Sequence, residues 1–146
     1  MRKLILAISV LALGSAAASA DPIADRQAYM KERGKIVGGL AKMVKGEQSF
    51  EAAGVQDALK QLEANAEKFD AEAMFPAGSE QGGDTTAAPK IWEDMPGFNA
   101  AEDKYLAAVK AAVAAPAADV DALKAQMGAL GAACAACHQT YRIKKG

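Results

Sequence analysis

Near its C-terminus the chain carries two cysteines three residues apart, followed directly by a histidine. Cys134, Cys137 and His138 spell C-x-x-C-H, and the 146 residues contain no other cysteine or histidine. Thiols at this spacing lie on one face of a helix. From there they can add to the two vinyl groups of a haem as thioethers, while the following imidazole binds the iron. The pattern therefore predicts one haem c, attached covalently.

Paired cysteines have two other common uses, in a structural disulfide and in a thiol–disulfide oxidoreductase. The histidine directly after Cys137 argues against both. The redox motif also belongs to folds that alternate strands and helices, whereas this chain shows no strand-like alternation of useful length. No catalytic base, nucleophile pair or substrate pocket is recognisable either, so the sequence predicts no enzyme.

The N-terminus has the three parts of a secretory signal peptide. Arg2 and Lys3 precede an apolar stretch, 4–13, and small residues ending in A-S-A follow it. The apolar stretch is too short to span a bilayer, although a retained N-terminal anchor is the alternative. We expect removal of residues 1–20 and export to the periplasm. Residues 21–146 then form one domain that does not insert into the membrane.

The charge of the chain is nearly balanced, with 17 basic and 18 acidic residues and a formal net charge of −1. No basic stripe is interleaved with aromatic residues, which argues against nucleic acid as a partner. A small basic cluster, Arg142, Lys144 and Lys145, ends the chain. Cations at a helix C-terminus complement the helix dipole, and a docking patch for an acidic redox partner is the alternative.

Apolar residues recur at helical spacing in four segments, which predicts an all-α fold. Asp21-Pro22 and Asp119 supply start signals for the first and last helices. The helices are expected at about 22–45, 51–73 and 97–114, and from 120 towards the end of the chain. Such helices favour an up-down-up-down antiparallel four-helix bundle with a covalently attached haem.

The inward face of the outer helices follows from the same spacing. For the first helix it comprises Ile23, Met30, Val37, Leu40 and Val44. For the last it comprises Leu123, Met127, Leu130, Cys134, Cys137 and Tyr141, which places both thiols in the core. A long connection rich in Gly and Pro, 75–96, separates the second and third helices, and its bulky apolar residues are Ile91 and Trp92.

The topology also indicates what faces His138. The first and last helices of such a bundle are antiparallel neighbours, so the opposing residues lie at about 26–33. Met30 falls on the inward face there, as a second axial ligand or as a core filler. Met43 and Met127 lie about 20 Å and about 16 Å away along their helices at 1.5 Å per residue, and are poor candidates.

Three further residues can reach this end of the bundle. Met74 and Met95 flank the long connection, so geometry alone leaves both open as ligands. Arg26 lies four residues before Met30 on the same helix face, where it could pair with a haem propionate.

The chain resembles the class II c-type cytochromes, the family of cytochrome c′ and cytochrome c-556. The resemblance covers essentially all of the mature domain. It rests on C-A-A-C-H-Q-T-Y-R at 134–142, A-P-K-I-W at 88–92, R-Q-A-Y-M at 26–30 and V-K-G at 44–46. The haem motif is specific at this position, because class I cytochromes carry theirs near the N-terminus.

The resemblance implies a four-helix bundle with haem c on Cys134 and Cys137 and with His138 as the proximal iron ligand. It also implies three residues near the haem: Arg26 and Gln27 beside a propionate, and Arg142 on the proximal side.

The family divides at the distal position, which Met30 occupies. In the c-556 type a methionine there binds the iron, and the six-coordinate low-spin haem transfers electrons. In the c′ type a blocking side chain, sometimes methionine, leaves five-coordinate iron open to NO or CO. Met30 favours an electron carrier whose partners are redox proteins, with a gas-binding cytochrome c′ as the alternative. A monomer, as in c-556 types, and a homodimer, as in c′ types, both stay open.

Overall fold

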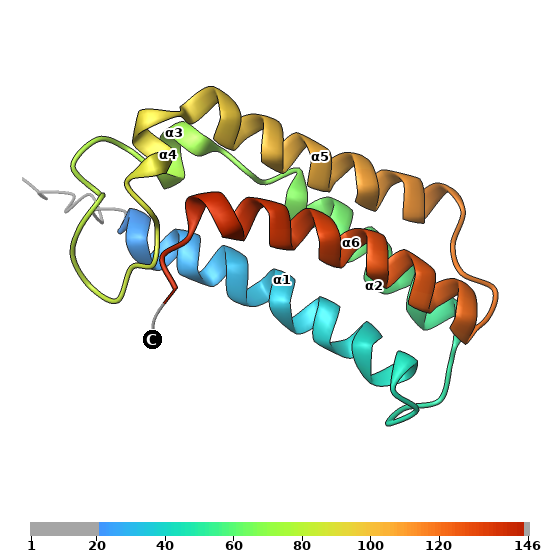
Figure 1. Ribbon diagram of the computed structural model, residues 1–146. Helices are drawn as coiled ribbons and strands as arrows, with labels where there is room; N and C mark the ends of the chain where they lie inside the picture. The colour runs from blue at the N-terminus through green and yellow to red at the C-terminus, as the bar shows by residue number, and fades with distance from the viewer. Residues whose placement is uncertain (1–20, 145–146) are drawn as a thin grey trace, which may run out of the picture.

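The computed structural model describes residues 21–144, in which four long helices form an antiparallel bundle (Figure 1). The helices are α1 (Pro22–Val44), α2 (Ala52–Ala66), α3 (Ala71–Met74), α4 (Lys90–Glu93), α5 (Met95–Ala114) and α6 (Val120–Tyr141). Helix α1 packs against α2 and α6, and α5 packs against the same two. The helices α1 and α5 are therefore diagonally opposite. The all-α four-helix bundle predicted from the sequence is confirmed.

Within 21–144, no helix has both the length and the apolar character needed to cross a bilayer. The predicted signal peptide, residues 1–20, lies outside the described residues, as does Lys145 of the C-terminal basic cluster.

Aspartate side chains cap the outer helices where the sequence predicts. The Asp21 carboxylate accepts hydrogen bonds from the backbone N–H groups of Ile23 and Ala24, at 3.0 and 3.2 Å. The Asp119 carboxylate accepts one from the N–H of Ala122 at 2.8 Å. Each cap pairs a backbone donor that has no partner inside its own helix. These two contacts fix where α1 and α6 begin.

The second helix is shorter than predicted. The apolar pattern favours one helix over 51–73, but α2 ends at Ala66 and the separate turn α3 begins after Asp70. Asp70 is extended, and its carboxylate accepts a hydrogen bond from the N–H of Ala73 at 3.0 Å. This local cap starts a new helix in a new direction, which apolar spacing alone cannot reveal.

The long connection is also more regular than its composition suggests. It contains α4, whose Ile91 is buried. Helix α5 begins at Met95, two residues before the predicted start. The cause is the Asp94 carboxylate, which accepts a hydrogen bond from the N–H of Gly97 at 3.1 Å.

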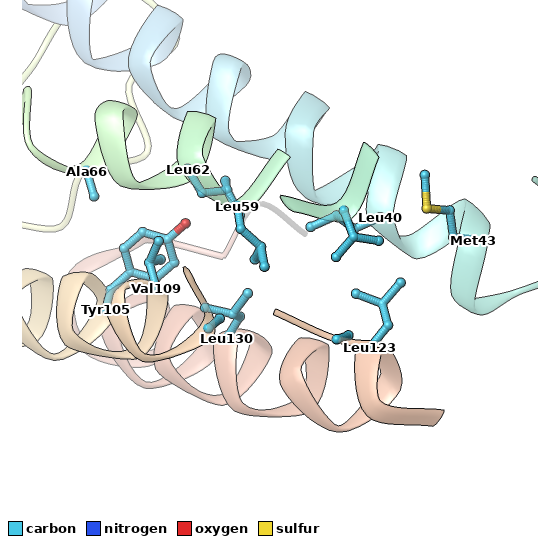
Figure 2. Close-up of a cluster of buried hydrophobic side chains, with 12 residues drawn as sticks. Leu40, Met43, Leu59, Leu62, Ala66, Tyr105, Val109, Leu123 and Leu130 are labelled. Atoms are coloured by element: carbon cyan, nitrogen blue, oxygen red, sulfur yellow. The ribbon is translucent and has the colours of Figure 1, made fainter. Parts of the chain in front are cut away.

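Two clusters of buried side chains fill the bundle. The larger one runs along its middle and comprises Leu40, Met43, Val55, Leu59, Leu62, Ala66, Tyr105, Val109, Ala112, Ala117, Leu123 and Leu130 (Figure 2). The smaller one is mostly aromatic and lies where α3 and α4 meet the ends of α5 and α6: Phe75, Ile91, Phe98 and Tyr141. Burying each large apolar side chain contributes about 1.5–3 kcal/mol before entropy is counted. The haem motif lies between these two clusters, because Cys134 packs against the first and Cys137 against the second.

The buried face of α1 differs from the predicted one. Of the five residues expected there, only Leu40 is fully buried, and the other four are half-buried. The other fully buried positions belong to Arg26, Tyr29, Arg33 and Met43. Two of these carry charge, so a count of apolar residues places the inward face slightly wrongly. Both arginines have partners inside the protein, described below.

Candidate haem-binding site

The three residues of the C-x-x-C-H motif occupy the last turns of α6, beside the N-terminal half of α1 (Figure 1). Cys134 and Cys137 are half-buried free thiols, and His138 is exposed. A cavity opens between α1, α5 and α6 at this point. Its lining consists of Met30, Arg33, Glu102, Tyr105, Ala133, Cys134, Cys137 and His138. The structure thus brings Met30 together with all three motif residues.

The other methionines of the described chain lie elsewhere. Met43 belongs to the larger core cluster and lines a groove between α1 and α2. Met127 packs against the same cluster. Met74 and Met95 pack against the smaller, aromatic cluster. Within residues 21–144, Met30 is therefore the one methionine in the lining of the cavity.

The protonation states of the motif residues follow from their surroundings. Burial raises the pKa of the Cys137 thiol to about 11, with Glu102 adding to the effect and Arg33 opposing it. Burial also raises the pKa of the Cys134 thiol. Although His138 is largely exposed, desolvation where its side chain meets the protein lowers its pKa, and the nearby charges of Arg142 and Arg33 lower it further. At neutral pH the imidazole is uncharged, which is the form that binds a metal.

The chemistry of the site fits a covalently bound haem. Two free thiols on one helix face and a neutral imidazole beside them are the groups that such a haem requires. The Tyr105 hydroxyl is buried beside the cavity and has no hydrogen-bond partner within the described chain. An orphaned buried hydroxyl indicates a polar partner from outside the chain. The cavity measures about 30 Å³, so the side chains that line it must separate to admit the ring.

A buried ion pair forms part of the cavity wall. Arg33 Nη1 donates to Glu102 Oε2 at 3.1 Å, and Arg33 Nη2 contacts Glu102 Oε1 and the Tyr29 hydroxyl. The Tyr29 hydroxyl donates to Glu102 Oε1 at 2.7 Å, and Arg33 Nε donates to Asn65 Oδ1 at 3.0 Å. Arg33 and Glu102 are 7% and 6% exposed. The pair therefore lies in the bundle interior and is held by α1, α2 and α5.

Aromatic rings complete the surroundings of Arg33. The guanidinium carbon lies 4.0 Å from the ring centroid of Tyr105 and 4.6 Å from that of Tyr29. Burial alone would lower the pKa of Arg33, but hydrogen bonding and charge attraction from Glu102 outweigh it and raise the pKa. Burial raises the pKa of Tyr105 to about 12. At neutral pH the arginine is charged and the phenol is not.

Sequence reasoning missed Arg33, Asn65 and Glu102, because charged and amide residues inside a helical pattern are normally assigned to the solvent face. One signal was available. Arg33 lies four residues after Tyr29 and seven after Arg26, so all three share one helix face. A face with two arginines and a tyrosine needs either solvent or internal partners.

The remaining predicted haem contacts occupy different positions. Arg26 is buried, but its guanidinium is bound to the long connection and does not line the cavity. Gln27 is exposed on α1. Arg142 follows α6, is exposed, and its Nε donates to the Thr86 hydroxyl at 3.4 Å. Contacts of Arg26 and Gln27 with a propionate, and of Arg142 with the proximal side, stay predictions.

A four-helix bundle with C-x-x-C-H in its last helix defines a c-type haem protein. Comparison with known proteins makes the assignment more specific: the family model described as Cytochrome C′ matches residues 21–142, and the chain belongs to this family. Its members are haem proteins that carry electrons or bind gases, with haem c held covalently. The present chain has two cysteines for that attachment.

Relatives of both types match the chain closely. Cytochrome c′ of Rhodopseudomonas palustris is 40% identical over 141 residues, which span 97% of this chain and 94% of the relative. Cytochrome c-556 of Agrobacterium fabrum is 39% identical over 127 residues, spanning 87% and 84%. The solved structure of the R. palustris cytochrome c′ superposes with a TM-score of 0.80 at 40% identity, covering 88% of this chain and all of that one.

Proposed function

We propose that the protein is a periplasmic single-electron carrier of the c-556 type. Cys134 and Cys137 hold one haem c through thioethers, and His138 and Met30 bind its iron from the two sides. The position of Met30 carries this proposal, because it lines the same cavity as the three motif residues. Helix packing brings Met30 to this place, because α1 packs beside α6 and Met30 lines the cavity between them.

The bound haem supplies a one-electron ferric–ferrous couple, and the chain sets its surroundings. The two cysteines would fix the ring against the last turns of α6, where Cys134 packs on the larger core cluster and Cys137 on the smaller one. His138 offers an uncharged imidazole on one side. The thioether of Met30 on the other side favours the softer ferrous state and raises the potential. Two protein ligands keep the geometry similar in both oxidation states, so little reorganisation opposes electron transfer.

A second candidate function is gas binding by five-coordinate iron. The relatives named cytochrome c′ and cytochrome c-556 match at 40% and 39% identity, so overall likeness does not favour one type. Methionine has three rotatable bonds and fills irregular gaps readily. In this alternative Met30 only covers the distal side and moves away when NO or CO arrives.

The visible spectrum of the haem-loaded protein distinguishes the two functions. We expect a sharp reduced α-band that CO leaves unchanged. The Met30→Ala variant should become high-spin and bind CO. Met74→Ala is the matched control, because Met74 is also half-buried near this end but packs in the aromatic cluster. A broad reduced spectrum that CO shifts in the unmutated protein would overturn the six-coordinate iron and support gas binding.

Export and partners belong to the same proposal. Residues 1–20 act as a cleaved signal peptide, and the mature protein, as a monomer or a homodimer, exchanges electrons with other redox proteins of the periplasm. The mass of protein recovered from the periplasmic fraction tests the first point. A mass equal to that of residues 21–146 plus one haem supports cleavage and export. A full-length chain retained in the membrane fraction contradicts them.

A further inference from the structure

We propose that the two charges of the buried Arg33–Glu102 pair act on the reduction potential of the haem in opposite directions, with the arginine raising it and the glutamate lowering it. The inference rests on the proposed function in one respect only, that a haem occupies the cavity beside Cys134 and Cys137. It holds whether or not Met30 binds the iron.

The position of the pair carries the inference. Arg33 comes from α1 and Glu102 from α5, the two diagonally opposite helices, so their side chains meet in the interior of the bundle. Both residues line the cavity that Cys134 and Cys137 also line. The charges are therefore in the wall of the haem site and are shielded from solvent.

The pair also supplies the charges of this wall. Among the residues lining the cavity in the described part of the chain, Arg33 and Glu102 are the two that form an ion pair. The raised pKa of Tyr105 leaves its phenol uncharged at neutral pH. The cysteines become neutral thioethers on attachment. Charges inside a protein interact far more strongly than charges in water.

The sign of each contribution follows from the electron balance. Reduction places one electron on the haem iron, and a reduced partner protein loses that electron; no bond forms and no proton is transferred in this step. A nearby positive charge stabilises the reduced state, and a nearby negative charge stabilises the oxidised state. With both charges present their effects largely cancel. Removing either one leaves the other uncompensated.

Neighbouring side chains hold the two charges in a fixed arrangement. Tyr29 contacts both members of the pair, and Asn65 accepts a hydrogen bond from Arg33 at 3.0 Å. Asn65 is itself fixed by donating to Glu32 Oε2 at 3.0 Å. Tyr29 and Asn65 are therefore positioning residues. Stability alone is a poor explanation for this network, because removing two charges from water offsets much of their attraction.

Spectroelectrochemical titration of the haem-loaded protein tests the proposal. Glu102→Gln keeps the shape of the side chain and should raise the potential; Arg33→Gln should lower it. Each change should alter the ferrous-to-ferric ratio at a fixed applied potential at least tenfold, which is 59 mV for one electron. The double variant should return close to the unmutated protein. Arg33→Lys keeps the charge and should shift the potential least.

A surface variant separates this effect from a general change in charge. Glu67 pairs with Lys110 at 3.2 Å, and its side chain is 52% exposed. Glu67→Gln removes the same charge as Glu102→Gln but from a solvated position. At a fixed applied potential, its ferrous-to-ferric ratio should therefore stay within a few-fold of that of the unmutated protein. Shifts of equal sign in Glu102→Gln and Arg33→Gln, or a Glu102→Gln shift no larger than that of Glu67→Gln, would overturn the proposal.

The same samples distinguish a failure here from a failure of the proposed function. If CO shifts the reduced spectrum of the unmutated protein, the six-coordinate iron is wrong while the opposite shifts in potential still support this inference. If the potential does not move and CO has no effect, the inference is wrong and the electron-carrier proposal stands. If Arg33→Gln does not fold, the shift in potential of Glu102→Gln compared with that of Glu67→Gln decides the question alone.

Discussion

Arg26 on α1 and Ser79 in the long connection are joined by two hydrogen bonds. Arg26 Nη1 donates to the Ser79 hydroxyl at 3.0 Å, and Nη2 donates to the Ser79 carbonyl at 2.7 Å. The same guanidinium donates to the Met74 carbonyl and the Thr85 hydroxyl, at 3.3 and 2.8 Å. It lies 5.1 Å from the ring centroid of Phe75. One buried side chain therefore binds the long connection to α1 at two points, Ser79 and Thr85.

Replacing Arg26 should loosen that connection. We expect Arg26→Ala to lower the free energy of unfolding by about 2–4 kcal/mol, because several hydrogen bonds to a buried cation are lost. Urea denaturation of the haem-free protein measures this. Gln27→Ala, the exposed neighbour, should change stability by less than about 0.5 kcal/mol. If Arg26 acts only on a propionate, Arg26→Ala will lose no stability in the haem-free protein and will lose stability in the haem-loaded protein.

The cap of the haem-bearing helix should contribute measurably. Asp119→Ala removes the acceptor for the Ala122 N–H and should cost about 0.5–2 kcal/mol of stability. Asp119→Asn keeps an acceptor at the same place and serves as the matched control. Thermal denaturation of both variants gives the comparison. Equal losses would mean that the negative charge of Asp119, and not its hydrogen bond, stabilises the start of α6.

His138 should make the haem-free protein sensitive to mild acid. Because desolvation lowers its pKa below the ordinary value of about 6.5, the unfolded chain binds a proton more readily than the folded chain. The contribution of His138 to stability is therefore present above the unfolded pKa and is lost as the pH falls through the folded pKa. Unfolding free energies from pH 7.5 downwards should decrease more steeply for the unmutated protein than for His138→Gln. Parallel curves would show that the imidazole is unperturbed.

The charges beside the cavity should also be detectable without haem. In Cys134→Ser, burial and Glu102 should still raise the pKa of the remaining Cys137 thiol, so alkylation by iodoacetamide should be slow at pH 8. Adding Glu102→Gln should lower this pKa, because Glu102 raises it, and adding Arg33→Gln should raise it. Alkylation rates against pH give both values. Identical pKa values in all three proteins would mean that neither charge reaches the thiol.

Helix periodicity and topology accounted for much of this molecule. The starts of α1 and α6 were predictable because Asp21 and Asp119 act within a few residues of themselves. That Met30 and His138 come near each other, in the lining of one cavity, was predictable from the antiparallel order of the helices and the rise per residue. Both arguments use local or repetitive geometry, which a sequence displays directly.

Other features depend on contacts that the sequence does not display. The Arg33–Glu102 pair joins residues 69 positions apart, and both look like solvent-facing positions in a helical pattern. The partners of Arg26 at Ser79 and Thr85 depend on the path of a connection with little periodicity. The break after α2 depends on one aspartate side chain. Buried polar groups and irregular backbone are thus where the structure adds most.

The residues just beyond α6 meet the long connection in a short antiparallel bridge between Ala87 and Arg142. The Ala88 N–H donates to the Tyr141 carbonyl at 3.0 Å, and the Ile143 N–H donates to the Thr86 carbonyl at 2.8 Å. Main-chain atoms make both bonds, so neither bond requires a particular side chain at 86, 88 or 143. Proline is the exception at 88 and 143, because it has no N–H to give. The end of the helix that bears His138 can therefore keep its position when the residues at 86, 88 and 143 are substituted.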